Sequence, residues 1–478
     1  MNNININNMN SYLPKTFLVT SHTKYVGQGS TFVAIKGQKE NGVTYITHAL
    51  EKGATTIVVA HDELLSNEIV QALASHQAKL VRVANTRQAL AQLSAQAYNF
   101  PARKLKIIAI TGTKGKTTTS WMLAHFFKQA GLKTALLSTV RNRILDTEFQ
   151  SELTTPQPDY IHAFLQACVA REVEWVVMET AAQAASLYRI DGIEFDGAIY
   201  TNFSSTHAEF YARVEDYFAA KKQILEQVKA SCPIILNGDD SKVFALQHYF
   251  PNAYCTYENG VYRICKTNVG IAWQYAYQGR LYNFECPSLI GSFNISNFAM
   301  AITLALKCSL SISDLQTFCK TFTGVPGRLE RYQLPNGASC FIDYAHTPSS
   351  FTAVLSLLRN MTQQLIVVFG AGGERDRSMR PQLGDIASTL ADAIVLTMDN
   401  PRSEQVTDII TDILAGIDQS YKQKVLVEVD RARAIEKAYT ISQPGAIIAL
   451  LGKGPDEYQI IGTQKLPFSE RAIVASFR

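Results

Sequence analysis

A short loop rich in glycine, threonine and lysine carries the clearest chemistry in this sequence. It reads Thr-Gly-Thr-Lys-Gly-Lys-Thr-Thr over residues 111–118 and follows an apolar, strand-like stretch. Glycines let backbone N–H groups approach phosphate oxygens, and a helix that begins there adds positive potential. Lys116 would reach the β- and γ-phosphates of a nucleotide, and the Thr117 hydroxyl would hold Mg²⁺. Ile110 stands where the usual Gly-x-x-x-x-Gly-Lys-Ser/Thr pattern has glycine, so the sequence predicts a variant phosphate loop rather than a chance glycine-rich turn.

The elements around this loop follow the pattern of a parallel sheet covered by helices. Apolar β-branched runs alternate with helical periodicity, in the order typical of βαβ units. The pattern predicts a helix over Thr117–Gly131 and strands at Lys106–Ile110, Trp175–Glu179, Gly197–Thr201 and Ile234–Leu236. Residues 254–286 alternate aromatic and polar side chains. They predict an antiparallel excursion packed on one face, in preference to a surface that stacks bases.

Two further α/β segments flank this central part. The first has predicted helices at Tyr45–Lys52 and Arg87–Phe100 and strands at Thr31–Ile35, Thr55–Ala60 and Leu80–Val83. The second begins after Gly324–Gly327 and has predicted strands at Cys340–Tyr344, Leu365–Phe369, Ala393–Leu396, Val425–Val429 and Ile447–Leu451. This second series predicts another doubly wound sheet. We therefore predict an α/β protein of three domains, over residues 1–100, 101–325 and 326–478.

Composition narrows the class of protein. The 478 residues include 45 Lys and Arg against 41 Asp and Glu, so the net charge of +4 gives no basic footprint for nucleic acid. With 47% hydrophobic and 18% charged residues the chain is ordinary globular protein, and no apolar run predicts a membrane span. The Asn-rich stretch Met1–Asn10 does not resemble a signal peptide, and the eight cysteines form no C-x-x-C pair. We expect free thiols in a reducing cytoplasm.

The phosphate loop is one of a series of motifs that resembles the Mur ligases, the ATP-dependent amide ligases of peptidoglycan synthesis. The series covers nearly the whole chain, in family order: 29–34, 53–54, 111–118, 154–156, 201–203, 219–221, 291–297, 327–328, 343–348, 372–377, 399–402 and 452–454. The resemblance implies a small N-terminal domain that binds a UDP-sugar acceptor and a central P-loop ATPase domain with a parallel sheet. It also implies a C-terminal Rossmann-like domain that binds an amino acid.

The resemblance also implies a reaction. It is strongest to the branch of the family that adds meso-2,6-diaminopimelate to UDP-N-acetylmuramoyl-L-alanyl-D-glutamate. There the acceptor carboxylate attacks the γ-phosphate of ATP to give an acyl phosphate, and an amine then displaces phosphate. Such phosphoryl transfer depends mainly on positioning and on neutralising charge. We therefore expect ATP and Mg²⁺ as cofactors and a monomer that works on small molecules, with neither nucleic acid nor membrane as partner.

Family positions imply the residues around ATP and the metal. Those expected to bind ATP are Gly112, Thr113, Lys114, Gly115, Lys116, Thr117, Thr118, Asn294, Asn297, Arg328, Asp343 and His346. Those expected to act in catalysis are Lys116, Glu179, His207, Lys221 and Arg328. Metal ligands would be Thr117, Glu179, His207 and Lys221, the last once carbamylated by CO₂. A structural histidine at 207 and a solvated lysine at 221, next to Lys222, remain the alternatives.

The two other substrates have their own implied residues. For the acceptor these are Ser21, Thr154, Thr155 and Arg189, and for the amino acid Arg375, Asp399, Asn400, Arg402, Gly452 and Asp456. Arg402, in Asp-Asn-Pro-Arg, is the family's signature for diaminopimelate. A guanidinium binds a carboxylate through two parallel hydrogen bonds, and diaminopimelate differs from lysine by such a carboxylate.

The departures from the family lie on the acceptor side. Thr20-Ser21-His22 stands where the family has Asp-Ser-Arg, and residues 180–183 read Thr-Ala-Ala-Gln where it has Val-Ser-Ser-His. Residues 206–211 likewise replace Asp-His-Leu-Asp-Tyr-His. Two alternatives therefore stay open. One is a paralogue that runs the same chemistry on another acceptor or amino acid, and the other is a scaffold that holds nucleotide without turnover.

Overall fold

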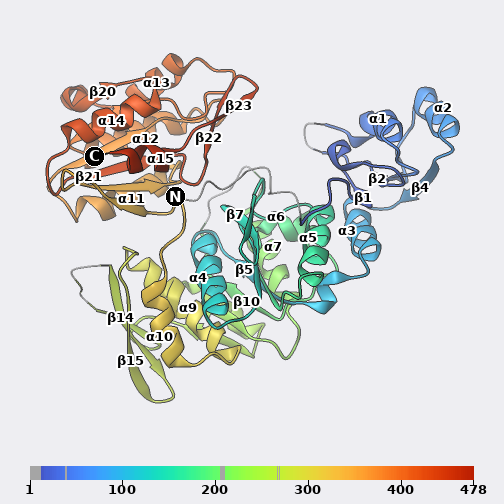
Figure 1. Cartoon of the computed structure of the whole chain (residues 1–478), viewed down its shortest axis with the longest axis horizontal. Coiled ribbons are helices and arrows are strands. Elements are labelled where there is room, and N and C mark those ends of the chain that lie inside the picture. The colour runs from blue at the N-terminus through green and yellow to red at the C-terminus, as the bar shows by residue number, and fades with distance from the viewer. Residues whose placement is uncertain (1–11, 38–39, 205–209, 266, 268–269, 478) are drawn as a thin grey trace. The chain divides into compact units, whose positions relative to one another are not determined.

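The computed structural model describes residues 12–37, 40–204, 210–265, 267 and 270–477. The chain forms two compact units, and each is described by itself (Figure 1). Unit 1 comprises residues 1–286 and 292–322, and unit 2 comprises residues 287–291 and 323–478. The predicted N-terminal tail and His207 lie outside the described residues. The predicted three-domain boundaries at 100 and 325 stay predictions.

Unit 1 begins with a parallel sheet in the order β1-β2-β3-β4. The strands are β1 (Val19–Thr20), β2 (Thr31–Val33), β3 (Thr56–Ala60) and β4 (Lys79–Val83), and the helices are α1 (Ile46–Glu51), α2 (Asn67–Ser75) and α3 (Thr86–Ala97). Successive side chains of a strand face opposite ways. Phe32 accordingly packs with Ile46 of α1, whereas Val33 packs with Leu90 of α3. The short β1 was not predicted.

The central sheet of unit 1 has eight strands in the order β12-β11-β10-β5-β9-β6-β7-β8. They are β5 (Lys106–Thr111), β6 (Thr134–Leu137), β7 (Arg141–Ile144), β8 (Thr147–Gln150), β9 (Trp175–Glu179), β10 (Gly197–Tyr200), β11 (Ile234–Asn237) and β12 (Ala253–Thr256). The predicted parallel sheet is confirmed, and the structure adds an antiparallel edge, where β7 pairs with β6 and β8. Tyr254 belongs to the parallel strand β12, so the antiparallel excursion begins later than predicted.

Helices cover this sheet, and a small antiparallel sheet adjoins it. The helices are α4 (Lys116–Gln129), α5 (Pro158–Val169), α6 (Ala182–Ser186), α7 (Val214–Glu226), α8 (Ser241–Phe244), α9 (Phe293–Lys307) and α10 (Ile312–Thr321). The small sheet consists of β13 (Tyr262–Cys265), β14 (Ile271–Tyr277) and β15 (Arg280–Cys286). Trp273 is 1% exposed and stacks between Phe284 and Phe298. These aromatic side chains therefore build a core, as predicted, and not a platform for bases.

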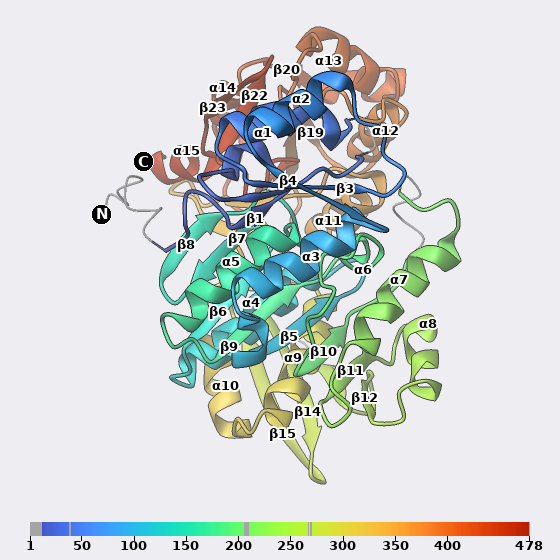
Figure 2. The same cartoon turned by 90° about the vertical axis from the view of Figure 1, so that its right-hand side faces the viewer.

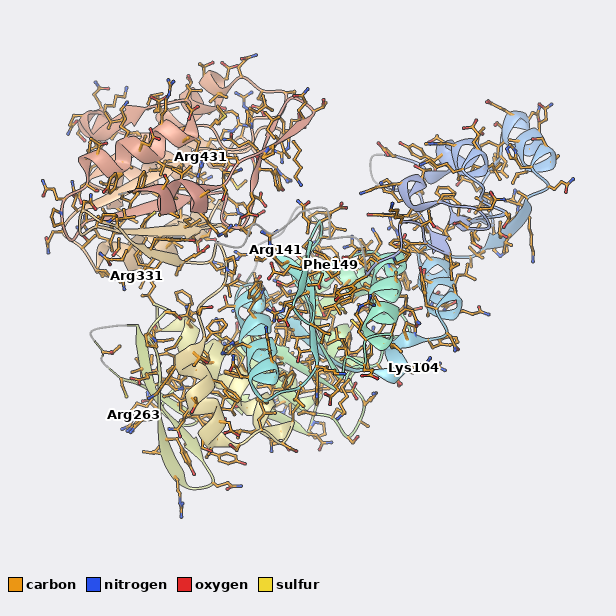
Figure 3. The ribbon with its side chains drawn as sticks, viewed as in Figure 1. Lys104, Arg141, Phe149, Arg263, Arg331 and Arg431 are labelled. Atoms are coloured by element: carbon orange, nitrogen blue, oxygen red, sulfur yellow. The ribbon has the colours of Figure 1, made fainter. Side chains whose placement is uncertain are left out.

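Unit 2 is built on a six-stranded sheet in the order β16-β17-β21-β18-β19-β20, parallel except for β16. The strands are β16 (Glu330–Gln333), β17 (Ser339–Asp343), β18 (Leu365–Phe369), β19 (Ala393–Leu396), β20 (Val425–Val427) and β21 (Ile447–Leu451). The other elements are α11 (Pro348–Arg359), α12 (Met379–Leu390), α13 (Val406–Leu414), α14 (Arg431–Ile441), α15 (Glu470–Ser476) and the hairpin β22 (Tyr458–Ile461) and β23 (Gln464–Pro467). Arg431, labelled in Figure 3, is buried and pairs with Glu470 at 2.8 Å. The predicted second doubly wound sheet is confirmed.

Two whole-chain expectations can be compared with the structure. All eight cysteines are free, as expected. Cys168 is fully buried, whereas Cys308 is partly exposed. Across the described residues, no helix is both long and apolar enough to cross a membrane.

Candidate active site

The phosphate loop joins β5 to α4 and has the predicted strand, loop and helix around it. Gly112 has φ 141° and Gly115 has φ 83°, a region of backbone conformation that side chains rarely adopt. Space is short as well. A β-carbon on Gly112 would lie 1.9 Å from Thr201 Oγ1, and one on Gly115 would lie 2.7 Å from Asn297 Oδ1. Both positions therefore require glycine, and the predicted ATP residue Asn297 lies against the loop.

Two lysines point at one carbonyl of this loop. Lys116 Nζ donates to Gly112 O at 2.9 Å and to Thr113 O at 3.0 Å, and Lys221 Nζ from α7 donates to Gly112 O at 2.6 Å. Burial and the charge of Lys116 hold the pKa of the Lys221 amine well below its usual range. Lys222 instead pairs with Glu226 at 3.4 Å. The geometry therefore places Lys221, and not its neighbour, beside the phosphate loop.

Glu179 ends β9 with a fully buried carboxylate that accepts hydrogen bonds from three residues. Thr117 Oγ1 donates to it at 3.1 Å, Ser138 Oγ at 2.5 Å, and Thr139 through its hydroxyl at 2.9 Å and its N–H at 3.0 Å. Sequence reasoning missed Ser138 and Thr139. Their signal was a Ser-Thr pair after the run 134–137, which forms the strand beside β9.

The oxygen donors at this point fit Mg²⁺. The Thr117 hydroxyl and the Glu179 carboxylate are hard ligands 3.1 Å apart, next to a loop shaped for phosphate. Mg²⁺ sites usually combine one or two carboxylates with phosphate oxygens of the substrate. Within the described ranges, no three His, Cys, Asp or Glu side chains gather as a metal cage. The proposed ligand His207 lies outside those ranges.

The predicted acceptor residues Thr154, Thr155 and Arg189 connect directly to this site. The hydroxyl oxygens of Thr139 and Thr154 are hydrogen-bonded at 3.1 Å. Thr155 Oγ1 donates to the backbone oxygen of Glu179 at 2.9 Å. Arg189 Nη1 donates to Thr155 O at 2.7 Å, and burial lowers the pKa of this guanidinium. A continuous run of hydrogen bonds therefore joins the phosphate loop to three of the four predicted acceptor residues.

The fourth acceptor residue, Ser21, lies elsewhere in unit 1, just after β1. Its backbone N–H donates to Asp159 Oδ2 at 3.2 Å. Asp159 is a residue of α5 that sequence reasoning did not select. On the ATP side, Asn297 Nδ2 donates to Asn294 Oδ1 at 3.3 Å, which links the two predicted asparagines within α9.

Arg328, Asp343 and His346 belong to unit 2. Asp343 is buried, and its two oxygens accept the N–H groups of Leu329 at 2.7 Å and Ala345 at 2.8 Å. Burial raises the pKa of this carboxyl, while the charge of Arg328 opposes that rise. Asp343 therefore holds the turn that carries Arg328, and its predicted contact with ATP stays a prediction. His346 is exposed, with Nδ1 2.7 Å from Tyr344 O.

The predicted amino-acid residues gather where β18, β19 and β21 end. Arg375 and Arg402 both flank Gly372, since a β-carbon there would lie 3.3 Å from Arg375 Cγ and 3.3 Å from Arg402 Nη1. Arg402 Nη1 also donates to Gly373 O at 2.5 Å. Among the residues that the structure describes, neither arginine forms an ion pair. Two cationic side chains, one from the loop after β18 and one from the loop after β19, thus lie against the same glycine.

Acidic residues complete this group. Gly452 has φ 106°, and a β-carbon on it would lie 2.5 Å from Asp399 Oδ2. Lys453 is buried, with Nζ 3.7 Å from Asp399 Oδ1 and 3.3 Å from Asn400 Oδ1. Burial raises the pKa of Asp456, while Lys453 opposes that rise. Carboxylates and guanidinium groups therefore meet at one edge, as a ligand with both ammonium and carboxylate groups requires.

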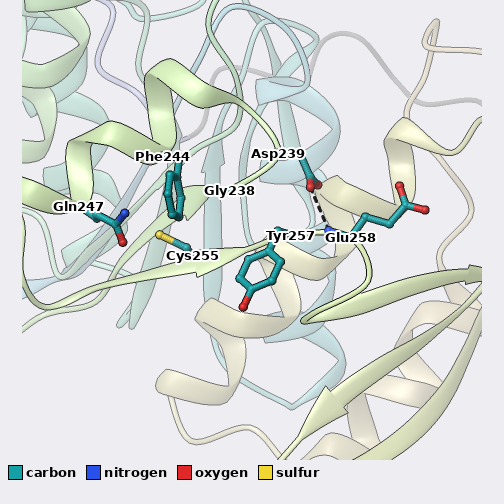
Figure 4. A pocket seen from close by; sticks show the side chains of 7 residues that line it. All are labelled: Gly238, Asp239, Phe244, Gln247, Cys255, Tyr257 and Glu258. Atoms are coloured by element: carbon teal, nitrogen blue, oxygen red, sulfur yellow. Dashed lines mark hydrogen bonds between the residues drawn. The ribbon is translucent and has the colours of Figure 1, made fainter.

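A hollow of about 490 Å³ lies elsewhere, beside β11 and β12 (Figure 4). Its lining consists of Gly238, Asp239, Phe244, Gln247, Cys255, Tyr257 and Glu258. Asp239 is held there by the backbone N–H of Glu258 at 3.0 Å. None of the predicted site residues lines this hollow, so the chemistry argued above does not depend on it.

Comparison with protein families identifies the arrangement. Residues 110–305 match the Mur ligase middle domain, and residues 327–454 match the glutamate ligase domain of Mur ligases. Residues 18–98 match the catalytic domain of the Mur ligase family. The chain belongs to the Mur ligase family. The phosphate loop, Glu179 and Lys221 lie in the part of this Mur ligase that matches the middle domain, and Arg375 and Arg402 in the part that matches the glutamate ligase domain.

Curated relatives and a solved structure extend the likeness over nearly the whole chain. The Mur ligase is 32% identical over 464 residues to an enzyme of Syntrophomonas wolfei, with 95% of this chain and 92% of the relative covered. It is 35% identical over 461 residues to an enzyme of Aquifex aeolicus, with the same coverage. Both are named UDP-N-acetylmuramoyl-L-alanyl-D-glutamate--2,6-diaminopimelate ligase. A solved structure of a ligase with that name matches with a TM-score of 0.64 at 26% identity, covering 96% of this chain and 94% of the other.

Proposed function

We propose that this Mur ligase joins an amine of meso-2,6-diaminopimelate to the D-glutamate carboxylate of UDP-N-acetylmuramoyl-L-alanyl-D-glutamate. ATP would become ADP and phosphate. The observation that carries the proposal is the run of hydrogen bonds from Thr117 through Glu179 to Thr139 and Thr154. Residues proposed to bind phosphate and residues proposed to bind the acceptor belong to one network, which supports a reaction between ATP and an acceptor carboxylate.

The first step transfers the γ-phosphoryl group. An oxygen of the acceptor carboxylate attacks phosphorus, the bond to the β-phosphate oxygen breaks, and an acyl phosphate and ADP form. Lys116 and the loop N–H groups would bear the charge that develops on the phosphate oxygens. In the second step the amine attacks the acyl carbon, phosphate leaves with the bonding electrons, and the amine loses a proton.

The residues around Glu179 would hold Mg²⁺, which neutralises phosphate charge when bound. Thr117 and Glu179 are the proposed ligands, together with His207. Lys221 is proposed to be carbamylated, and its low pKa supports this, because only an uncharged amine adds to CO₂. The carbamate would turn the buried amine beside Gly112 into an anion able to support a second metal ion.

The amino-acid site would discriminate diaminopimelate from lysine through Arg375 and Arg402. The Cγ of Arg375 and the guanidinium of Arg402 flank Gly372, and neither arginine makes an ion pair among the described residues. A ligand carboxylate would supply the missing counter-charge through paired hydrogen bonds. Asp399 and Asp456 would attract the ligand's ammonium groups. We also propose a monomer acting in the cytoplasm, where ATP and nucleotide sugars are available.

The test is phosphate release by the purified protein, with each substrate omitted in turn and the product identified by mass spectrometry. The proposal requires release that depends on ATP, the muramoyl dipeptide and diaminopimelate together. Release that proceeds with lysine and not with diaminopimelate would contradict the role of Arg402. Light scattering of the same sample tests the monomer.

A second candidate keeps this chemistry but uses another carboxylate acceptor. The altered residues 20–22 and 180–183 favour it, because they lie on the acceptor side alone. Phosphate release with acceptors that keep the D-glutamate end but lack the UDP-sugar separates the two candidates. Equal kcat/KM for both acceptors would support the second candidate.

A further inference from the structure

Asp159 carries a buried carboxylate that no sequence motif singled out. It lies in the first turn of α5 and is 3% exposed. Its Oδ2 accepts the hydroxyl of Thr20 at 2.8 Å and the N–H of Ser21 at 3.2 Å, and its Oδ1 accepts the N–H of Tyr160 at 2.9 Å. A helix on the central sheet therefore binds the segment that ends β1 in the N-terminal sheet.

This carboxylate is buried without a cation. In the described part of the chain no lysine or arginine forms an ion pair with Asp159, and burial raises its pKa against the pull of its hydrogen bonds. A buried charge without a partner is costly, and the N-terminal turn of α5 offsets only part of that cost. If the contact only joined the helix to the edge of the sheet, neutral or apolar side chains would do so at a lower cost in desolvation free energy.

Among the described residues, the other polar side chains near Asp159, on α3 and α5, do not make hydrogen bonds to the segment after β1. The helix α3 packs against α5, as Figures 1 and 2 show from two sides. On these helices, Ser94 Oγ, both ring nitrogens of His162 and Gln166 Oε1 are buried without a hydrogen-bond partner in the described structure. His162 and Gln166 follow Asp159 at helical spacing, on the same stripe of α5. Asp159 is thus the member of this stripe that makes directional bonds to residues 20–21.

The bonds of Asp159 continue into the predicted acceptor segment. Thr20 is fully buried, and its hydroxyl oxygen also accepts the N–H of His22 at 3.1 Å. Through its bonds to Thr20 and Ser21, and through the Thr20 hydroxyl to His22, one carboxylate therefore fixes the backbone conformation of three successive residues. Position 20 is threonine and supplies no carboxylate of its own. The carboxylate next to Ser21 comes from another element.

We propose that Asp159 is a positioning residue for the acceptor, holding Thr20 and Ser21 in the conformation that receives it. The inference rests on the proposed function. Asp159 touches none of the residues around the phosphate loop, so its loss weakens acceptor binding and leaves turnover of bound substrates intact. Asparagine cannot replace it, because one amide oxygen cannot accept from both Tyr160 and the Thr20–Ser21 segment.

The experiment compares steady-state kinetics of Asp159→Asn, Asp159→Leu and a matched control. Asp191→Asn is the control, because Asp191, like Asp159, accepts a hydrogen bond from the N-terminal part of unit 1, here from Gln92 Nε2 of α3 at 3.4 Å, yet does not contact residues 20–22. We expect Asp159→Asn to raise KM for the muramoyl dipeptide by about 10-fold and Asp159→Leu by more. The kcat and the KM for ATP should change less than about twofold, and Asp191→Asn should behave as the unaltered enzyme.

The rescue variant combines Thr20→Asp with Asp159→Asn, so that the carboxylate is supplied from position 20 instead of position 159. It should recover most of the lost acceptor affinity, which a role in stability alone does not predict. Equal rises in KM for ATP and acceptor, or a lowered melting temperature with unchanged KM, would overturn the proposal.

A second readout separates this inference from the proposed function. If the unaltered enzyme does not turn over the muramoyl dipeptide at all, the proposed function fails, and amide hydrogen exchange of Ser21 and His22 decides the role of Asp159. Positioning by Asp159 requires faster exchange there in Asp159→Asn than in Asp191→Asn. Equal exchange in the two variants refutes it.

Discussion

The two cationic sites of this Mur ligase hold their charges in different ways. At the phosphate loop of unit 1, Lys116 and Lys221 both donate to Gly112 O, at 2.9 and 2.6 Å. In unit 2, Arg375 and Arg402 flank Gly372 and form no ion pair with the residues that the structure describes. Both lysines of the first pair donate to the same backbone carbonyl of the phosphate loop, whereas in the second pair Arg402 donates to one carbonyl, Gly373 O, and its guanidinium keeps further N–H donors for a ligand.

The difference matches what each site must recognise. Phosphoryl transfer needs charge at set points before the reaction begins, so preorganised donors serve best. Binding a free amino acid needs planar, paired hydrogen bonds to a carboxylate and gains from donors that the protein itself does not use. Variants at the loop should therefore mainly lower kcat, whereas variants at the arginines should mainly change which amino acid is used.

The largest effect is expected at Lys116. Lys116→Ala removes the cation nearest the transferred phosphoryl group and should lower kcat on the order of 10³-fold. Lys128→Ala is a matched control at the other end of α4, where the side chain is half-exposed and pairs with Asp146 at 2.5 Å. Phosphate release measures both variants. Normal turnover by Lys116→Ala would break the comparison, because the loop would then not be the phosphate site.

Lys221 provides the next largest effect. Lys221→Gln should lower kcat by about 100-fold, if the carbamate supports a metal ion. Lys222→Gln is the adjacent control, because Lys222 pairs with Glu226 at 3.4 Å and does not contact the loop. Depleting CO₂ should lower the activity of the unaltered enzyme, and bicarbonate should restore it. If the activity of the unaltered enzyme does not depend on CO₂ while Lys221→Gln is inactive, Lys221 acts as an unmodified amine.

How accurately a strand or helix could be predicted from the sequence depends on the element. Strands covered on both faces are continuous apolar runs, and β9, β18, β19 and β21 have the predicted bounds. The hairpin β7–β8 was missed, because Arg141-Asn142-Arg143 alternates charged and polar side chains and has no long apolar run. The strand β1 has two residues, too few for any period to be visible.

The site shows the same division. The phosphate loop is local in sequence, so its strand, turn and helix could be predicted together. The choice between Lys221 and Lys222 could not, because neighbouring residues of a helix point about 100° apart and only packing decides which one meets the loop. Ser138, Thr139 and Asp159 were missed for a related reason. Each meets its partner across strands or helices distant in the chain, as when Asp159 binds Thr20 139 positions away.

A smaller effect is expected at Arg402, but it tests directly which amino acid the enzyme selects. Arg402→Leu should lower kcat/KM for diaminopimelate by about 10- to 100-fold, the range expected for one lost charged hydrogen-bond pair, and leave ATP binding unchanged. Use of lysine should change little, so the preference for diaminopimelate narrows. Arg433→Leu serves as a control on α14, with an exposed side chain. Equal losses for both amino acids would mean that Arg402 shapes the loop and does not read the second carboxylate.

The smallest effect is a pH dependence at Asp456. Burial raises the pKa of this carboxyl, so it takes up a proton at a higher pH than an exposed aspartate does. Only its ionised form attracts the ammonium group of the amino acid. The kcat/KM for diaminopimelate should therefore fall as the pH is lowered from neutrality, before ordinary carboxyl groups titrate. Asp456→Asn should lower the kcat/KM for diaminopimelate about 10-fold at neutral pH and remove most of its fall at acid pH.

The kcat/KM for ATP is the control. Measured over the same pH range, it should have the same profile in both proteins. A parallel fall for ATP would place the titrating group at the phosphate loop and reverse the contrast between the two sites.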